Sequence, residues 1–209
     1  MNKKYLSNCF KKILNANYMH LVEETASFTY SFQSGAVKGL KIYFEWSNGA
    51  TDWKNNFDFP AKPYRDMQDK WYAHRGFLRV WKAIEPRLKD AVMNPDIKYI
   101  EIFGYSHGAA IALLCHEYCK YHRPDINVWG YGFGSPRVIW GLPGKRVRDR
   151  LKGFRVIRNE GDIVTHLPPA ILGFRHCPTV LTIGDGSYNC IDAHRPESYI
   201  AELEKEDNQ

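Results

Sequence analysis

The chain has 209 residues, of which 44% are hydrophobic and 14% aromatic, so it can bury a sizeable core as a single domain over residues 1–209. Its formal charge of +6 is a mild excess that can favour anionic surfaces but is also ordinary for a basic soluble protein, and no segment resembles a nucleic-acid-binding module. No apolar stretch approaches the ~18 residues of a membrane-spanning helix. Polar residues also interrupt the N-terminal segment, so we expect no signal peptide and a cytoplasmic location. Export by a non-standard route is the alternative.

The first elements are expected to be a helix followed by two strands. Apolar residues recur at helical spacing from Leu6 to Leu21, which predicts an amphipathic helix within residues 1–25. Packing against the sheet of the same domain is the common fate of such a helix, and a membrane surface is the alternative. Strict alternation over 27–32 and the apolar run 40–46 predict two strands.

Strands and helices alternate through the rest of the chain. Helices are expected from Phe77 to Val92, with a kink at Pro86, and then to about His122 and over 197–203. The further strands are expected at 99–103, 128–133, 154–157 and 180–183. This order predicts an α/β fold with a mostly parallel central sheet and helices on both faces.

A nucleophile elbow is predicted where the strand 99–103 meets the next helix. Gly104-Tyr105-Ser106-His107-Gly108 has the Gly-x-Ser-x-Gly spacing in the strand–turn–helix setting that this motif requires. The turn exposes the hydroxyl of Ser106 at a helix N-terminus, where backbone N–H groups stabilise an oxyanion. The sequence therefore predicts a serine hydrolase with an α/β-hydrolase fold, and its histidine and acid should follow Ser106.

Asp162 and His194 are the best candidates for these two partners. Asp162 directly follows the strand 154–157, at the sheet edge where such folds place their active sites. The rival acids are Asp125, Glu160 and Asp185. His194 lies on a loop after the last strand and before the final helix, whereas His166 is only four residues past Asp162. A turn aspartate and a loop histidine are the structural alternatives.

Five motifs in order resemble the class 3 lipase family, which contains the fungal lipases. They are the elbow, His74-Arg75-Gly76-Phe77, residues 131–138 (YGFGSPRV), residues 162–169 (DIVTHLPP) and residues 193–199 (AHRPESY). The matches run from about residue 28 to 200. The resemblance implies that Ser106, Asp162 and His194 form a catalytic triad.

The resemblance also implies an oxyanion hole formed by the backbone N–H of His107 and by Ser47. Here Glu45-Trp46 replaces the Arg-Gly of the family, so Trp46 stands beside this loop. Residues 49–58 fall where fungal lipases carry a lid helix, with Trp53 and Phe57 one helical turn apart. We expect Trp46, Trp53, Phe57 and Tyr105 to contact the substrate.

The remaining cysteines and aromatic residues have structural interpretations. Cys115, Cys119 and His122 share a helical face, but a buried helix face accounts for them better than zinc does, so no metal or cofactor is expected. The thiols should be free, with a Cys177–Cys190 bridge as the alternative. Trp71, Tyr72, Trp81 and Trp140 are expected to form core or groove walls.

The predicted function is hydrolysis of carboxylic esters, as in a lipase or esterase, through an acyl-enzyme intermediate. The partner is a lipid or a small acyl ester, with transient contact to a lipid interface. Polar Lys54, Asn55 and Asn56 in the lid segment make short, water-dispersed esters as plausible as bulk triglyceride. A catalytically silent binding or signalling module is the alternative from another class, and a serine acyltransferase or peptidase on this fold also remains open.

Overall fold

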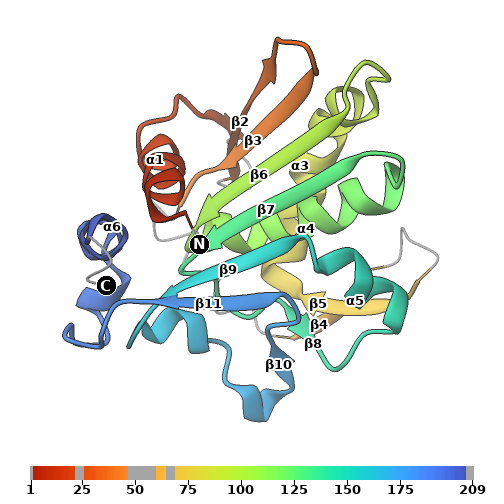
Figure 1. Cartoon of the computed structure of the whole chain (residues 1–209). Coiled ribbons are helices and arrows are strands. Elements are labelled where there is room, and N and C mark those ends of the chain that lie inside the picture. Colours follow the sequence, from red (N-terminus) through yellow and green to blue (C-terminus); the bar gives the residue numbers. More distant parts are fainter. Residues whose placement is uncertain (1, 22–25, 47–59, 65–68, 206–209) are drawn as a thin grey trace.

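A seven-stranded sheet forms the centre of the computed structural model, which describes residues 2–21, 26–46, 60–64 and 69–205 (Figure 1). Its strand order is β1-β2-β3-β6-β7-β9-β11. The strands are β1 (Met19–Leu21), β2 (Ala26–Gln33), β3 (Gly39–Phe44), β6 (Tyr99–Tyr105), β7 (Asn127–Phe133), β9 (Phe154–Asn159) and β11 (Thr179–Ile183). From β3 to β11 all neighbours pair in parallel, whereas β1 and β2 extend the sheet in antiparallel pairing. The predicted mostly parallel sheet is confirmed.

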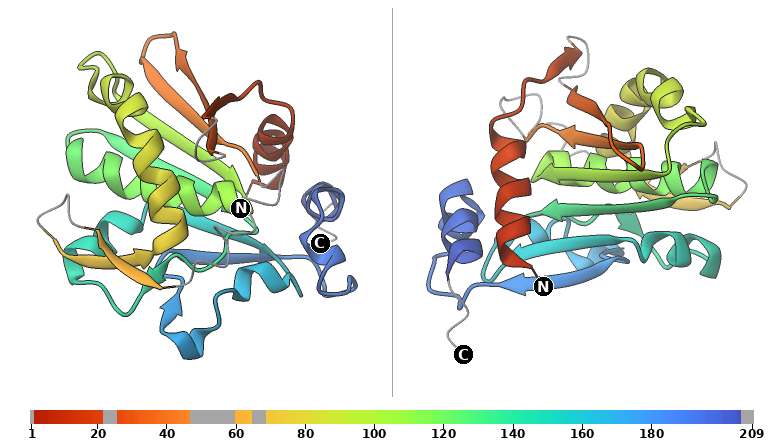
Figure 2. Two further views of the ribbon diagram at one scale, coloured as in Figure 1. Left: turned by 180° about the vertical axis from the view of Figure 1, so that it is seen from behind. Right: turned by 45° about the horizontal axis from the view of Figure 1, so that its top comes forward.

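Helices cover both faces of this sheet, as expected. On one face lie α3 (Arg75–Met93) and α4 (His107–His122), and α5 (Lys145–Leu151) packs against α4. On the other face α1 (Lys3–Leu14) and α6 (Pro196–Glu204) lie side by side (Figure 2). The helix α3 runs as one element through Pro86.

The sheet separates two clusters of buried apolar residues. The larger cluster fills the space towards α3 and α4, and includes the fully buried Trp81. The smaller cluster lies under α1 and α6, where the ring of Phe10 packs 5.1 Å from that of Tyr105 and 5.6 Å from that of Tyr199. Burial of these rings is the main force that holds α1 on the sheet.

The N-terminal helix is shorter than the sequence pattern suggests. α1 ends at Leu14, because Asn15 turns its side-chain amide back to donate to the carbonyl of Lys11 (2.8 Å). The chain then enters β1, so Leu21 belongs to a strand that pairs with β2 and not to the helix. The apolar side of α1 is buried against the sheet, which leaves its polar side for solvent.

A second, four-stranded sheet was not predicted. Its order is β10-β8-β5-β4, all antiparallel, and it flanks α3. The strands are β4 (Ala61–Tyr64), β5 (Trp71–His74), β8 (Ile139–Trp140) and β10 (Phe174–Arg175). Strands of two to four residues are too short to show the alternation by which strands are recognised in a sequence.

Three short 3₁₀ helices follow the carboxyl ends of the main sheet. They are η1 (Ile163–His166), η2 (Ala170–Leu172) and η3 (Asp192–His194). Parallel strands end at the same edge, so the residues after β6, β9 and β11 meet there. Among the described residues, no helix has the length and apolar character needed to cross a membrane.

Candidate active site

Ser106 occupies a strained turn between β6 and α4. Its backbone has φ 54° and ψ −121°, which makes it the one non-glycine residue with positive φ in the described part of the chain. The flanking glycines are required by contact. A Cβ on Gly104 would stand 2.2 Å from the carbonyl oxygen of Gly108, and one on Gly108 would stand 2.3 Å from that of Glu45. The two glycines therefore allow the close approach of backbone segments that the elbow needs, because nothing larger than hydrogen fits at either position.

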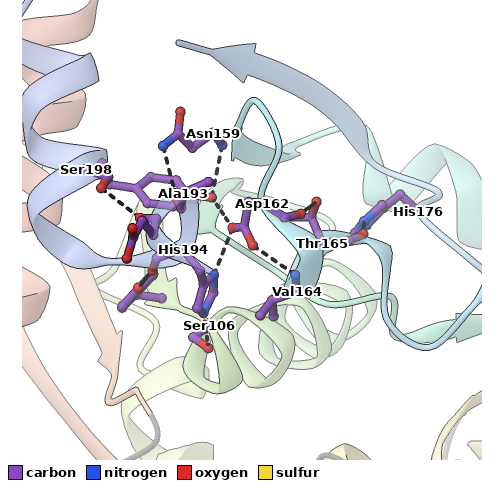
Figure 3. Close-up of polar contacts among 12 residues, drawn as sticks. Ser106, Asn159, Asp162, Val164, Thr165, His176, Ala193, His194 and Ser198 are labelled. Atoms are coloured by element: carbon purple, nitrogen blue, oxygen red, sulfur yellow. Dashed lines mark hydrogen bonds and ion pairs between the residues drawn. The ribbon is translucent and has the colours of Figure 1, made fainter. Parts of the chain in front are cut away.

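Asp162 and His194 lie in line with this serine (Figure 3). The Nε2 atom of His194 is 2.8 Å from the Oγ of Ser106, and its Nδ1 atom is 2.8 Å from the Oδ2 of Asp162. Asp162 is fully buried, while the His194 side chain is 20% exposed. With Nδ1 protonated, His194 donates to Asp162 and leaves Nε2 to accept from the serine hydroxyl.

Two further donors orient the carboxylate of Asp162. The backbone N–H of Val164 donates to Oδ1 (2.9 Å), and the hydroxyl of Tyr199 donates to Oδ2 (2.7 Å). Tyr199 is fully buried, and burial together with the nearby charge of Asp162 raises the pKa of its phenol well above the ordinary value. The phenol is therefore a permanent donor, and its oxygen in turn accepts from the backbone N–H of Asn159 (3.0 Å).

The loop after Asp162 is fixed by a second chain of hydrogen bonds. The hydroxyl of Thr165 donates to the backbone carbonyl of Asp162 (2.8 Å), and the Nε2 of His176 lies 2.8 Å from the carbonyl of Thr165. Burial lowers the pKa of His176 to about 4, so this imidazole is neutral and donates. These contacts hold the turn that presents the carboxylate.

Tyr105 does not face the substrate side as expected. Its ring is 1% exposed and belongs to the cluster under α1. There it stacks 5.2 Å from the ring of His194, and its hydroxyl donates to the backbone carbonyl of His194. Residues alternate between the two faces of a strand, and position 105 falls on the α1 face. Tyr105 therefore supports the histidine from behind instead of contacting substrate.

The remaining binding residues are placed only in part. His107 opens α4, so its backbone N–H lies at the positive end of that helix, while its ring is buried edge-on against Phe77 (5.4 Å). The ring of Trp46 lies 5.8 Å from that of Tyr105. Ser47, Trp53 and Phe57 lie outside the described residues, so their roles stay predictions.

Tyr199, Asn159 and Gly134 were not singled out from the sequence as site residues. Gly134 has φ +57°, and a Cβ there would come 2.9 Å from Cε1 of His194. The side-chain amide of Asn159 donates to the carbonyl of Ala193 (3.0 Å), which fixes the loop before His194. Gly134 and Tyr199 both lie in motifs that the sequence shows, but the residues around them in the sequence do not indicate that they contact the triad.

The alternatives considered from the sequence do not form a comparable arrangement. The rival acids Asp185 and Glu160 are exposed. The Sγ atoms of Cys115 and Cys119 lie 3.9 Å apart in the core, and no group of three or more metal-ligating side chains occurs in the described residues. All five cysteines, including Cys177 and Cys190, are free thiols.

Known proteins resemble this chain in both sequence and fold. The family model described as Lipase (class 3) matches residues 42–172. A lipase of Rhizomucor miehei is 30% identical over 158 residues, which are 72% of this chain and 43% of that protein. The secreted mono- and diacylglycerol lipase 1 of Fusarium solani is 27% identical over 158 residues, 73% of this chain and 46% of that one. The chain thus spans less than half the length of these curated relatives.

Solved structures with the same fold come from fungal lipases. The Rhizomucor miehei triacylglyceride lipase superposes with a TM-score of 0.68 at 21% identity, covering 89% of this chain and 79% of that one. A lipase from Rhizopus microsporus var. chinensis gives a TM-score of 0.60 at 21% identity, over 93% and 75%. These neighbours confirm the predicted α/β-hydrolase fold. The match of the family model to most of the chain shows that it belongs to the class 3 lipase family.

Proposed function

We propose that this protein is a serine carboxylic-ester hydrolase that acts on acyl esters, lipids among them. The observation that carries the proposal is the unbroken line of contacts from Ser106 Oγ through the His194 ring to Asp162, with each step 2.8 Å long. A buried carboxylate, an imidazole with one exposed edge and a strained serine together suit acyl transfer. The curated relatives, which are named lipases, support the same reaction class.

In this mechanism the Oγ of Ser106 attacks the ester carbonyl carbon while His194 Nε2 takes the hydroxyl proton. The resulting imidazolium is stabilised by Asp162, whose charge is fully buried beside it. Collapse of the tetrahedral intermediate breaks the bond to the leaving alcohol, which receives the proton from Nε2. Water then attacks the acyl-serine by the same route, with His194 as general base, and releases the carboxylic acid.

The oxyanion of the tetrahedral intermediate needs donors on the side away from the histidine. His107 supplies its backbone N–H from the first turn of α4, where the helix dipole adds positive potential. Ser47 is proposed as the second donor, because it follows β3 and the Glu45 carbonyl packs against Gly108 at the start of α4. Removal of one such donor in a serine hydrolase costs about 3–4 kcal/mol of transition-state stabilisation.

The proposed substrates range from short, water-dispersed acyl esters to acylglycerols. The Fusarium solani relative is named for mono- and diacylglycerols, and its similarity suggests the same class here. A substrate contact by Trp46 stays a proposal that rests on the sequence alone, because its ring lies beside that of Tyr105, on the α1 side of the sheet. The protein is proposed to meet lipid substrate by transient contact with the lipid surface. A cytoplasmic location stays a proposal that rests on the sequence alone.

A series of p-nitrophenyl esters with increasing acyl length tests the proposal, with Ser106→Ala as the blank. We expect hydrolysis that depends on Ser106 and has an optimum in chain length, because the acyl chain must bury its surface in a site of fixed size. A rate equal to that of the Ser106→Ala protein at every chain length would leave the silent-module interpretation in place. Addition of an alcohol acceptor during the assay separates acyltransferase from hydrolase activity.

A further inference from the structure

Five large apolar side chains gather on the solvent side of the second sheet and its neighbouring loop. We call them the apolar patch, which consists of Tyr72, Trp140, Leu142, Ile171 and Leu172. Ile171 is 93% exposed and Leu142 is 67% exposed, while the other three are exposed by 42–49%. Tyr72 and Trp140 thus differ from Trp71 and Trp81, which are buried as expected. Single exposed apolar residues are common, but five on segments that are hydrogen-bonded to one another usually mark an interaction surface.

The apolar patch is held together by backbone contacts. Tyr72 and Trp140 are cross-strand partners of β5 and β8, with ring centroids 5.7 Å apart. The indole N–H of Trp140 donates to the carbonyl of Leu172 (2.9 Å), and the N–H of Gly141 donates to the carbonyl of Gly173 (2.9 Å). The polar atom of the tryptophan is therefore satisfied inside the protein while its ring remains exposed. The surface is preformed, and so little entropy is lost when it is covered.

Basic side chains border the patch on its α5 side. Residues 137–152 contain six basic residues, counting Lys and Arg together, and one Asp. Lys145 and Arg146, shortly after Leu142, are 81% and 83% exposed, and they form ion pairs with Asp149 (2.6 Å) and Asp69 (3.8 Å). Basic residues outnumber acidic ones here, so the positive charge stays in excess. Arg175 of β10, also exposed, follows the patch on the other strand. Apolar and aromatic side chains next to exposed cations form the combination that binds a lipid surface with anionic headgroups.

The patch is also connected to the candidate active site. The loop that carries Ile171 and Leu172 starts at Asp162, and Arg137 holds it by donating to the carbonyls of His166 (2.6 Å) and Pro168 (3.1 Å). This loop, next to β10, forms the lowest part of the molecule in Figure 1 and in the left view of Figure 2, away from the main sheet. A planar surface can therefore reach its tip without contact with α1 or α6.

We propose that the apolar patch docks the protein onto the surface of an anionic lipid aggregate. Ile171, Leu142 and Trp140 enter the boundary between headgroups and acyl chains, while Lys145 and Arg146 lie among the anionic headgroups. The purpose of this docking, delivery of acyl esters to Ser106, rests on the proposed function. The binding itself does not, and it is measured with protein that cannot hydrolyse the lipid.

The test is co-sedimentation of Ser106→Ala protein with vesicles of pure phosphatidylcholine or of phosphatidylcholine with phosphatidylglycerol. We expect strong binding to the anionic vesicles, which weakens with salt, and at least tenfold weaker binding to the neutral ones. The substitutions Leu142→Asp and Ile171→Asp, made together in the Ser106→Ala protein, should lower binding to anionic vesicles at least tenfold. Val37→Asp is the matched control, because Val37 is 55% exposed and lies on the β2–β3 turn outside the patch.

The proposal would be overturned if the protein bound neither kind of vesicle. It would also be overturned if Val37→Asp lowered binding to anionic vesicles as much as the two patch substitutions do. A dimer in solution that Ile171→Asp dissociates would also overturn it, since the patch would then cover a second copy of the chain. The two proposals fail separately. Vesicle binding by a protein without Ser106-dependent esterase activity refutes only the proposed function. We expect the Leu142→Asp/Ile171→Asp protein to hydrolyse a soluble short ester at the full rate, and its Ser106→Ala form to bind anionic vesicles at least tenfold more weakly.

Discussion

The hydroxyl of Tyr199 provides a sharp test of how the triad acid is held. Tyr199→Phe removes one oxygen and leaves the buried ring in place among its neighbours. The lost bond is 2.7 Å long and donates to the same Asp162 oxygen that contacts His194. A hydrogen bond to a charged group contributes about 1.5–3 kcal/mol to stability, and the orphaned N–H of Asn159 costs about 1–3 kcal/mol more. We expect the free energy of unfolding to fall by about 3–5 kcal/mol.

The effect on catalysis follows from the geometry of the carboxylate. Without this hydroxyl, His194 is the one partner of Oδ2 left among the described residues, so the carboxylate can rotate about the Val164 contact and the imidazole loses its fixed orientation. We expect kcat to fall by about tenfold to 100-fold, which corresponds to about 1.4–2.7 kcal/mol. KM should change little, because Tyr199 lies behind the acid and away from the substrate.

Tyr5→Phe is the matched control for this experiment. Tyr5 also donates a 2.7 Å hydrogen bond to a carboxylate, that of Glu101, but it joins α1 to β6 and lies outside the triad. It should lower stability in urea unfolding and leave kcat unchanged. A Tyr199→Phe protein that is destabilised but retains full kcat on a soluble ester would refute a role of this hydroxyl in positioning Asp162.

Further predictions concern backbone space and pH. Gly134→Ala should lower kcat/KM at least 100-fold, because its Cβ would come 2.9 Å from a ring atom of His194. The control Gly141→Ala should leave kcat/KM unchanged, because Gly141 also has a positive φ (+70°) but a Cβ there meets no atom within 4 Å. Equal kcat/KM in the two variants would contradict this prediction. Burial lowers the pKa of His116 to about 3 and that of His176 to about 4, so the unfolded chain takes up protons first as pH falls below about 6.5. From pH 7.5 to 5.0 the two histidines should together cost about 4 kcal/mol of stability, and urea midpoints that do not decrease would show that they are not held neutral.

The main sheet was predictable because each of its elements is long enough to show its own period. The strand that ends at Tyr105 and the helix from His107 to His122 were predicted to within two residues at each end, since a buried parallel strand and the following helix leave continuous apolar runs. The second sheet was not, because β8 and β10 have two residues each and exist only through pairing with distant segments. The end of α1 was missed for a similar reason, since β1 depends on its partner β2.

The catalytic residues of the candidate site could be predicted from the sequence, whereas the residues that support them could not. Ser106, Asp162 and His194 could be chosen from chain order and from their places after strands, and the structure brings all three together. The support for the site could not be chosen, because Tyr199 and Gly134 act through distances across the fold. Tyr105 was assigned to substrate from its place in the motif. Which face of β6 it occupies depends on the sheet, and α1 covers that face.

Activation of Ser106 by His194 is measured by the rate at which a fluorophosphonate modifies the folded protein, followed by mass spectrometry of the digested peptides. We predict one adduct, on Ser106, and a rate at least 1000-fold lower in His194→Gln, because the hydroxyl is nucleophilic only while Nε2 accepts its proton. An adduct on another residue, or an equal rate in His194→Gln, would show that Ser106 is not activated by this histidine.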